Sequence, residues 1–148
     1  IQIFNLTERY KKEVWTPAAP LTVNKCAVLG AGPRLAAENY AVTTHAGTPN
    51  VSGSSDGASG SFRNPYGIAI DAAKNLYVSD TLNNTIRKIT PARVVSTLAG
   101  TAGLFGSADG TGAAARFNCP TAVVVDKEGT IIVADRDNNC LRRLTGRH

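Results

Sequence analysis

The chain has 148 residues, of which 43% are hydrophobic, so it can bury the core of one compact domain or of two small ones. Charged residues make up 18%, aromatic residues 6%, and fourteen glycines and seven prolines interrupt the rest. This balance favours short strands with many turns over a helical bundle. No apolar run reaches the roughly 18 residues that cross a bilayer, so no membrane contact is expected. The net charge of +5 comes from scattered residues, which argues against nucleic acid as a partner.

The first part of the chain, residues 1–40, carries no pattern that assigns a fold. After it, Ala41–Gly47 is rich in β-forming residues and predicts a strand. The stretch Gly53–Gly60 follows, and its glycines together with Asp56 are typical of a long surface loop. We therefore expect an unassigned segment, 1–40, and a second region, 41–148, that is built from strands and turns.

Four β-rich runs of the second region predict a four-stranded sheet over about residues 67–98. The first two runs are almost continuously apolar, which is typical of a sheet covered on both faces, and a hairpin-length turn at 72–75 joins them. A third run begins after the pair Asn83-Asn84, and a fourth follows the next turn. The expected strands are Gly67–Asp71, Leu76–Asp80, Thr85–Ile89 and Val94–Leu98.

A second set of runs follows another glycine-rich stretch, Gly103–Gly112, which contains Asp109. It predicts a three-stranded copy of the same sheet over about residues 122–145. Gly129 supplies the positive φ that the hairpin turn of this copy needs. The expected strands are Ala122–Asp126, Ile131–Asp135 and Cys140–Leu144.

The two sheets are copies of one sequence unit. In the first half of the unit, matching residues such as Gly57 and Gly110 are separated by 53 positions. In the second half, matching residues such as Phe62 and Phe117 are separated by 55, so the second copy has two extra residues in a loop. A unit of about 55 residues with four strands is longer than a helical repeat and has the size of a propeller blade.

Four stretches of the first copy closely resemble NHL repeats. They are Asn64–Asp71, Asn75–Asp80, Asn83–Ile89 and Val94–Gly100. The resemblance extends over about residues 41–148 and implies an all-β fold, a partial β-propeller of four-stranded blades. Propellers of this family serve mostly as binding platforms, and a minority are lyases or hydrolases that use metal and acidic residues in a central channel. The sequence shows no such set, so we expect no catalytic residue, no metal ligand and no cofactor, and we do not expect an enzyme.

Two recognisable blades cannot close a propeller ring, which typically needs four to eight. The third strand of the second copy leaves a sheet edge with unpaired N–H and C=O groups. The segment Ala41–Ala46 matches the fourth strand of the unit and has no readable partner strands, so we expect another copy of the chain to donate it. Such head-to-tail donation gives a ring or a filament of identical chains. The alternative is that the missing blades belong to sequence outside these 148 residues.

Acceptor motifs for N-glycans and three cysteines bear on the compartment. The motifs start at Asn5, Asn50 and Asn83. They favour an extracellular, secreted glycoprotein in which Cys119 and Cys140 pair as a disulfide and Cys26 is left over. Three unpaired, buried thiols are the alternative. The cysteine spacing does not fit a zinc site.

Polar residues that recur in both copies have structural as well as functional interpretations. Asp80 and Asp135 each end a strand shortly before an Asn-Asn pair, where Asp commonly caps a turn by accepting a backbone N–H. Basic residues recur in the third strand of each copy, and we expect them on solvated strand edges, with rows that bind anionic surfaces as the alternative. These basic residues are Arg87, Lys88, Arg142 and Arg143.

The function that these observations favour is a non-catalytic module for protein–protein interaction or extracellular structural assembly. Its expected partners are proteins, in the first place copies of itself. Two alternatives stay open. One is a fragment of a propeller enzyme, a lyase or hydrolase, and the other is a propeller that binds RNA or other anions through the basic rows.

Overall fold

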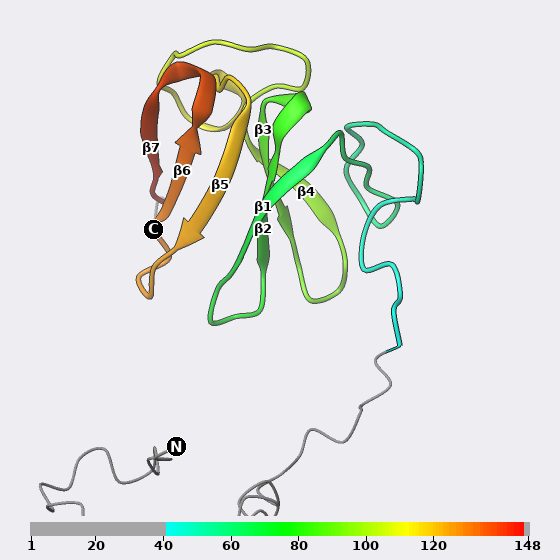
Figure 1. Cartoon of the computed structure of the whole chain (residues 1–148). Coiled ribbons are helices and arrows are strands. Elements are labelled where there is room, and N and C mark those ends of the chain that lie inside the picture. The colour runs from blue at the N-terminus through cyan, green and yellow to red at the C-terminus, as the bar shows by residue number, and fades with distance from the viewer. Residues whose placement is uncertain (1–40, 147–148) are drawn as a thin grey trace, which may run out of the picture. The chain divides into compact units, whose positions relative to one another are not determined.

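The computed structural model describes residues 41–146, which form two antiparallel β-sheets (Figure 1). The first sheet, blade 1, has the order β1-β2-β3-β4, and the second, blade 2, has the order β5-β6-β7. Blade 1 consists of β1 (Pro65–Ile70), β2 (Leu76–Asp80), β3 (Thr85–Ile89) and β4 (Val95–Ala99). Blade 2 consists of β5 (Pro120–Val125), β6 (Ile131–Asp135) and β7 (Cys140–Leu144). The all-β, partial-propeller fold expected from the sequence is thus confirmed.

Short 3-10 turns connect some of the strands. They are η2 (Thr81–Asn83), η3 (Gly112–Ala114) and η4 (Arg136–Asn138). The turns η2 and η4 occupy equivalent places, each between the second and third strand of its blade. Within the described part of the chain, no helix is long and apolar enough to cross a membrane.

Most strand bounds agree with the sequence prediction. β2, β3, β6 and β7 begin and end where expected, whereas β1 and β5 begin two residues earlier. The strand predicted at Ala41–Gly47 is wrong for the isolated chain, because residues 41–47 form no strand in the structure. A strand needs a partner edge for its backbone hydrogen bonds, and Val42 in this segment is 96% exposed.

Local polar contacts fix the hairpin turns that join the first two strands of each blade. Asp71 accepts hydrogen bonds from the backbone N–H and the side-chain amide of Asn75, both at 2.8 Å. The amide of Asn75 is the main reason why the pKa of Asp71 lies below its ordinary value. In blade 2, Asp126 accepts from the backbone N–H of Glu128 and of Thr130. Gly129 has φ of 83°, as predicted for this turn.

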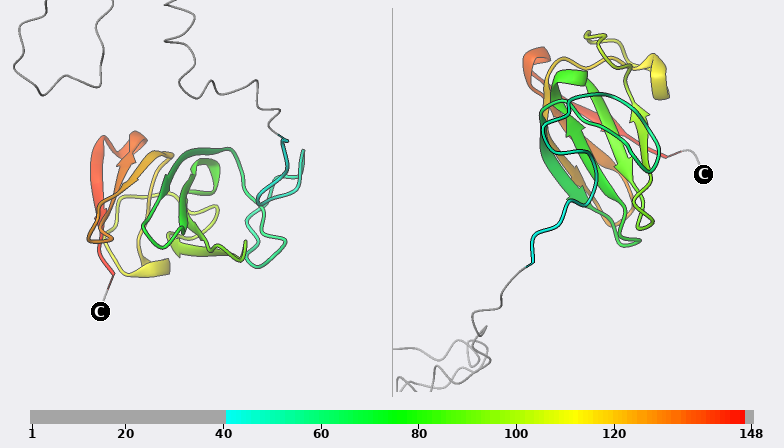
Figure 2. Two further views of the ribbon diagram at one scale, coloured as in Figure 1. Left: turned by 90° about the horizontal axis from the view of Figure 1, so that it is seen from below. Right: turned by 90° about the vertical axis from the view of Figure 1, so that its right-hand side faces the viewer.

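The two blades stack face to face, and the larger apolar core lies between them (Figure 2). Hydrogen bonds also cross this interface, because Ser79 and Thr81 of blade 1 donate their hydroxyls to the carbonyls of Thr121 and Pro120 at 3.0 and 2.7 Å. The buried members of the core are Tyr77, Ile86, Ala99, Ala115, Phe117, Val123, Ile131 and Val133. A fixed stacking geometry follows from this combination of apolar packing and directed hydrogen bonds.

Close approach of the two backbones requires a glycine at position 67. A Cβ atom on Gly67 would lie 2.5 Å from the carbonyl oxygen of Thr121 and 2.9 Å from the Cα of Ala122. Both atoms belong to the backbone of β5, so they cannot move aside as the end of a flexible side chain can.

Replacing Gly67 with alanine should therefore push the blades apart. We expect Gly67→Ala to lower the free energy of unfolding by about 1–3 kcal/mol, measured by urea denaturation. Gly146→Ala is the control, because a Cβ there meets no atom within 4 Å. Equal stability of the two variants would contradict the close packing of β1 on β5.

Candidate protein interaction surface

A buried ion pair links the second and third strands of blade 1. Arg87 on β3 donates to Asp80 at the end of β2 over 2.8 Å, and both side chains are fully buried. Arg87 also donates to Asp56 at 2.6 Å and to the carbonyl oxygens of Ser55 and Ser61. These bonds attach the glycine-rich loop that precedes β1 to the middle of the sheet. We call Asp80, Arg87 and Asp56 the clamp of blade 1.

Blade 2 has the same clamp at the equivalent positions. Arg142 donates to Asp135 at 3.1 Å and to Asp109 at 2.6 Å, and it also contacts the carbonyl oxygens of Arg116 and Ala108. The guanidinium groups of both clamps lie over an aromatic ring, at 5.3 Å from the Phe62 centroid in blade 1 and 5.4 Å from the Phe117 centroid in blade 2. The interpretation of Arg87 and Arg142 as residues of solvated strand edges is therefore wrong, whereas Arg143 is exposed.

The aspartates of the clamps act between distant parts of the chain and do not cap the turns that follow them. Neither η2 nor η4 has a side-chain cap hydrogen bond. Asp80 instead accepts from the backbone N–H of Arg63, and Asp135 accepts from that of Asn118, both at 2.7 Å. The turns close because Asn84, like its counterpart in the second copy, adopts the left-handed conformation, which Asn tolerates better than most residues.

Burial argues against Asn83 as a glycan acceptor. Its side-chain nitrogen donates to Asp80 at 2.8 Å and to the carbonyl oxygen of Gly53 at 2.7 Å, and the residue is 5% exposed. A glycan on this nitrogen would take the place of a buried donor. Asn50 is exposed, and Asn5 lies outside the described residues.

The predicted disulfide is also wrong, because Cys119 and Cys140 are both free thiols. Cys119 directly precedes Pro120, which is paired with Asp135 on β6, and Asp135 is paired with Cys140 on β7. One strand thus separates the two cysteines, which puts their Cα atoms about 10 Å apart, beyond the roughly 7 Å that a disulfide spans. Burial, followed by contact with the carboxylate of Asp137, raises the pKa of the Cys119 thiol.

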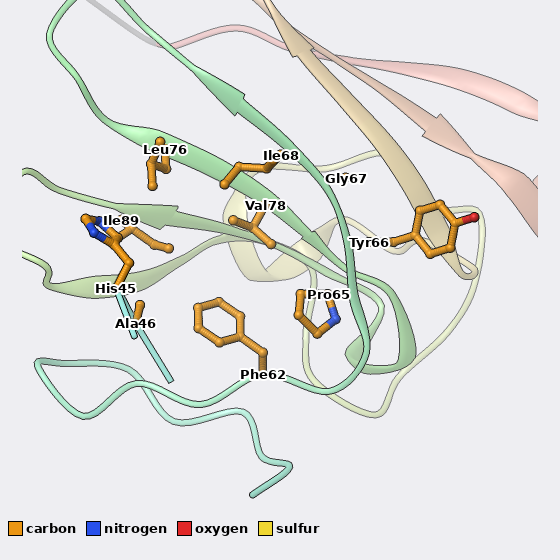
Figure 3. A pocket seen from close by; sticks show the side chains of 10 residues that line it. All are labelled: His45, Ala46, Phe62, Pro65, Tyr66, Gly67, Ile68, Leu76, Val78 and Ile89. Atoms are coloured by element: carbon orange, nitrogen blue, oxygen red, sulfur yellow. The ribbon is translucent and has the colours of Figure 1, made fainter. Parts of the chain in front are cut away.

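The outward face of blade 1, which points away from blade 2, carries an apolar hollow of about 320 Å³ (Figure 3). Figure 3 shows Phe62, Leu76, Val78 and Ile89 around it, with Ala46 and His45 at its margin. We call this surface the blade 1 face. Its middle is a small second core of Val78, Ile89 and Val95. Its rim is unusually exposed for large apolar residues, because Ile68 is 64% and Tyr66 73% exposed.

Residues of the blade 1 face correspond to those of blade 2 that are buried between the blades. Position by position, Phe62, Ile68, Leu76, Val78 and Ile89 match Phe117, Val123, Ile131, Val133 and Leu144. The difference in burial is large. Val123 is 5% exposed where blade 1 covers it, whereas its counterpart Ile68 is 64% exposed.

The outward face of blade 2 shows the complementary difference. Ile86 of blade 1 is fully buried in the interface between the blades, whereas its counterpart on β7, Leu141, is 74% exposed. Ala69 packs at the edge of the same interface, and its counterpart Val124 is 59% exposed. We call the surface around Val124 and Leu141 the blade 2 face. The two faces are thus the two halves of a blade–blade interface, each without its other half among the described residues.

Stacked antiparallel sheets that recur with the sequence unit, here one of four strands and one of three, are typical of the blades of a β-propeller. Among the comparisons with known proteins, the family model of the NHL repeat matches residues 117–144. This part of the chain is an NHL repeat, as the sequence resemblance predicted.

Proteins with similar sequence or structure are much longer than this chain. An 87-residue part is 32% identical to the protein SUPPRESSOR OF QUENCHING 1, chloroplastic, of Arabidopsis thaliana, and covers 58% of this chain and 8% of that protein. An auxiliary nutrient binding protein of Bacteroides thetaiotaomicron matches 67% of this chain and 27% of its own at a TM-score of 0.60 and 26% identity. A structural genomics protein of unknown function from the same bacterium matches 66% of this chain and 26% of its own at a TM-score of 0.63 and 28% identity.

The clamps make a testable contribution to stability. Replacing Arg87 with methionine leaves Asp80 buried and without its positive partner, so we expect the free energy of unfolding to fall by about 3–5 kcal/mol. The matched change Arg142→Met also leaves a buried carboxylate, Asp135, without its positive partner. It should cost less, because the Arg142 side chain is 11% exposed whereas that of Arg87 is fully buried, so water can reach the vacated site. Urea denaturation measures both, with Arg143→Met as the control for loss of an exposed charge. Equal losses of unfolding free energy in Arg87→Met and Arg142→Met would contradict the conclusion that the complete burial of Arg87 sets the larger cost.

Proposed function

We propose that the chain is a non-catalytic propeller-type module that binds other proteins through the outward faces of its blades. The observation that carries the proposal is the exposure of the blade 1 face. Five apolar residues there match residues that are packed between the blades one repeat later. Apolar patches of this kind on a protein surface commonly mark interaction sites.

The form of the surface supports a protein partner better than a small molecule. The hollow on the blade 1 face is shallow for a ligand pocket, and its described lining is apolar apart from His45 and Tyr66. A small ligand needs several converging polar groups for orientation, whereas a flat apolar sheet face packs well against another sheet. A partner that presents apolar strand residues therefore fits the surface.

A charge placed on the blade 1 face should block such binding without unfolding the protein. We expect Ile68→Lys to weaken association at least tenfold, because the lysine would be buried where the repeat has Val123. Sedimentation velocity of the full chain over a range of concentrations measures the association. Thermal unfolding of Ile68→Lys should match that of the wild type, because Ile68 is already mostly exposed.

Leu104→Lys is the matched control, since Leu104 is an apolar residue of similar exposure that lies in the loop 100–111 and outside both faces. The control should associate like the wild type. A wild-type chain that is folded and monomeric at every concentration, and that binds no protein through this face, would contradict the proposed function.

Secretion stays a prediction that glycan mapping can check. If the protein passes through a secretory pathway, we expect a glycan at Asn50, which is exposed, and none at Asn83, whose side-chain nitrogen is buried and donates two hydrogen bonds. Mass spectrometry of peptides from the native protein measures occupancy at both positions. A glycan at Asn83 in the folded protein would contradict the structure of the blade 1 clamp.

A further inference from the structure

The outer edge of β7 has no partner strand within residues 41–146, whereas the equivalent edge of blade 1 is covered by β4. On that covered edge, Ile89 is paired with Val95 and Arg87 is paired with Thr97. The backbone groups of Val95 also bond to Gly57 of the preceding loop, at 2.8 and 3.1 Å. The fourth strand of a blade is therefore held on both sides, by the third strand and by the glycine-rich loop.

One side chain of the loop recognises the fourth strand. Asp56 accepts a hydrogen bond from the backbone N–H of Thr97 and another from its hydroxyl, each at 3.0 Å. Burial on its own would raise the pKa of Asp56, but the bonds from Thr97 and Arg87 outweigh it, so the pKa lies below its ordinary value. Thr97, which is paired with Arg87, thus completes the hydrogen bonds of Asp56.

Blade 2 has the equivalent place for a fourth strand, between β7 and its glycine-rich loop, and this place is empty among the described residues. A groove of about 870 Å³ runs beside β7, and its lining includes Asp109, Gly110, Arg142 and Leu144. These residues match Asp56, Gly57, Arg87 and Ile89 of blade 1. Asp109 is held by Arg142 on one side and is otherwise open to solvent, with 96% of its side chain exposed.

Residues 42–46 have the sequence of the missing strand. Val42-Thr43-Thr44-His45-Ala46 matches Val95-Ser96-Thr97-Leu98-Ala99 of β4. This segment lacks the packing that β4 has, because Val95 is 1% exposed whereas its counterpart Val42 is 96% exposed.

The backbone after this segment already follows the path that the chain takes after β4. Gly47 has φ of 88° and Gly100 has φ of 90°. A Cβ on Gly47 would lie 3.3 Å from Cδ2 of Phe62, and a Cβ on Gly100 would lie 3.3 Å from Cδ2 of Phe117. Ala46 packs against the small core of blade 1, just as Ala99 packs in the core between the blades. Residues 42–46 therefore enter blade 1 from the position of a fourth strand of a preceding blade.

We propose that residues 42–46 of one copy of this chain bind the β7 edge of a second copy and become the fourth strand of its blade 2. This inference rests on the proposed function, for which it names the partner. In the composite blade, Val42 pairs with Leu144 and fills the groove, Thr43 pairs with Arg143, and Thr44 pairs with Arg142 and donates to Asp109. Strand addition at an open edge supplies backbone hydrogen bonds, and the groove and Asp109 supply selectivity.

The donor and acceptor cannot be the same copy. Residues 42–46 lead into the outward side of blade 1, and β7 is the edge strand of blade 2, with the stacked sheets between them in Figure 1 and in the left view of Figure 2. Strand donation also presses the blade 2 face of the acceptor against the blade 1 face of the donor.

A disulfide trap tests the pairing register. The variant Thr43→Cys/Arg143→Cys, in a chain whose native cysteines are replaced by serine, should form disulfide-linked chains on mild oxidation, because paired residues bring their Cβ atoms within bonding range. Thr44→Cys/Arg143→Cys is the control, since neighbouring residues of a strand point to opposite faces. Non-reducing electrophoresis counts linked chains. Equal linking in both variants, or in neither, would overturn the proposed strand exchange.

Removal of the threonine hydroxyl tests the recognition by Asp109. Thr44→Val should weaken association about tenfold or more, because a hydrogen bond to a carboxylate is lost, whereas Thr43→Val should have little effect. Sedimentation velocity measures both. Strand donation is overturned if Ile68→Lys weakens association, Thr44→Val does not, and the disulfide trap links both cysteine variants equally or neither. That combination of results leaves the proposed function standing. A folded monomer that binds no protein overturns both.

Discussion

The structure depends on one buried charge, that of Arg87, which two carboxylates from different parts of the chain neutralise. Removing Arg87 from water is favourable only if its charge and its donors find partners, and these come from the end of β2 and from the loop before β1. Asp80 is equally dependent, because it accepts from Arg63, Asn83 and Arg87 at once. Two strands and a glycine-rich loop must therefore reach their places together. This explains how a loop with many glycines can have a defined path.

The clamp also determines what the blade presents to its neighbours. By holding the loop against the sheet, it places Phe62 over the guanidinium group and on the outward face of blade 1. The repeat places Phe117 in the same way, but there the ring is covered by the preceding blade and is 1% exposed. Each blade thus makes one apolar face for the blade before it and another for the blade after it. Such units stack on one another, and the outermost units of a stack keep an uncovered apolar face unless a further unit packs against it.

Much of the fold could be predicted from the sequence, because strand periodicity and the duplication of a unit are local or repetitive signals. Burial of Arg87 could not, since an arginine in a strand is by default placed at a solvated edge. A signal was nevertheless present. Complementary charges recur in register at Asp56 and Asp109, at Asp80 and Asp135, and at Arg87 and Arg142. A set of opposite charges copied together points to an ion pair inside the unit. The free state of Cys119 and Cys140 follows from strand order, which cysteine spacing does not contain.

An open sheet edge attracts any extended chain, so the β7 edge needs a means of selection. Asp109 can provide it. A strand laid along β7 removes water from this carboxylate, and Arg142 contacts it from one side only. A strand with threonine opposite Arg142 replaces the lost water by two hydrogen bonds, as Thr97 does for Asp56. A strand with an apolar residue there supplies fewer, and an acidic residue repels the carboxylate. The same aspartate that fixes the loop therefore favours the strand that the repeat itself encodes.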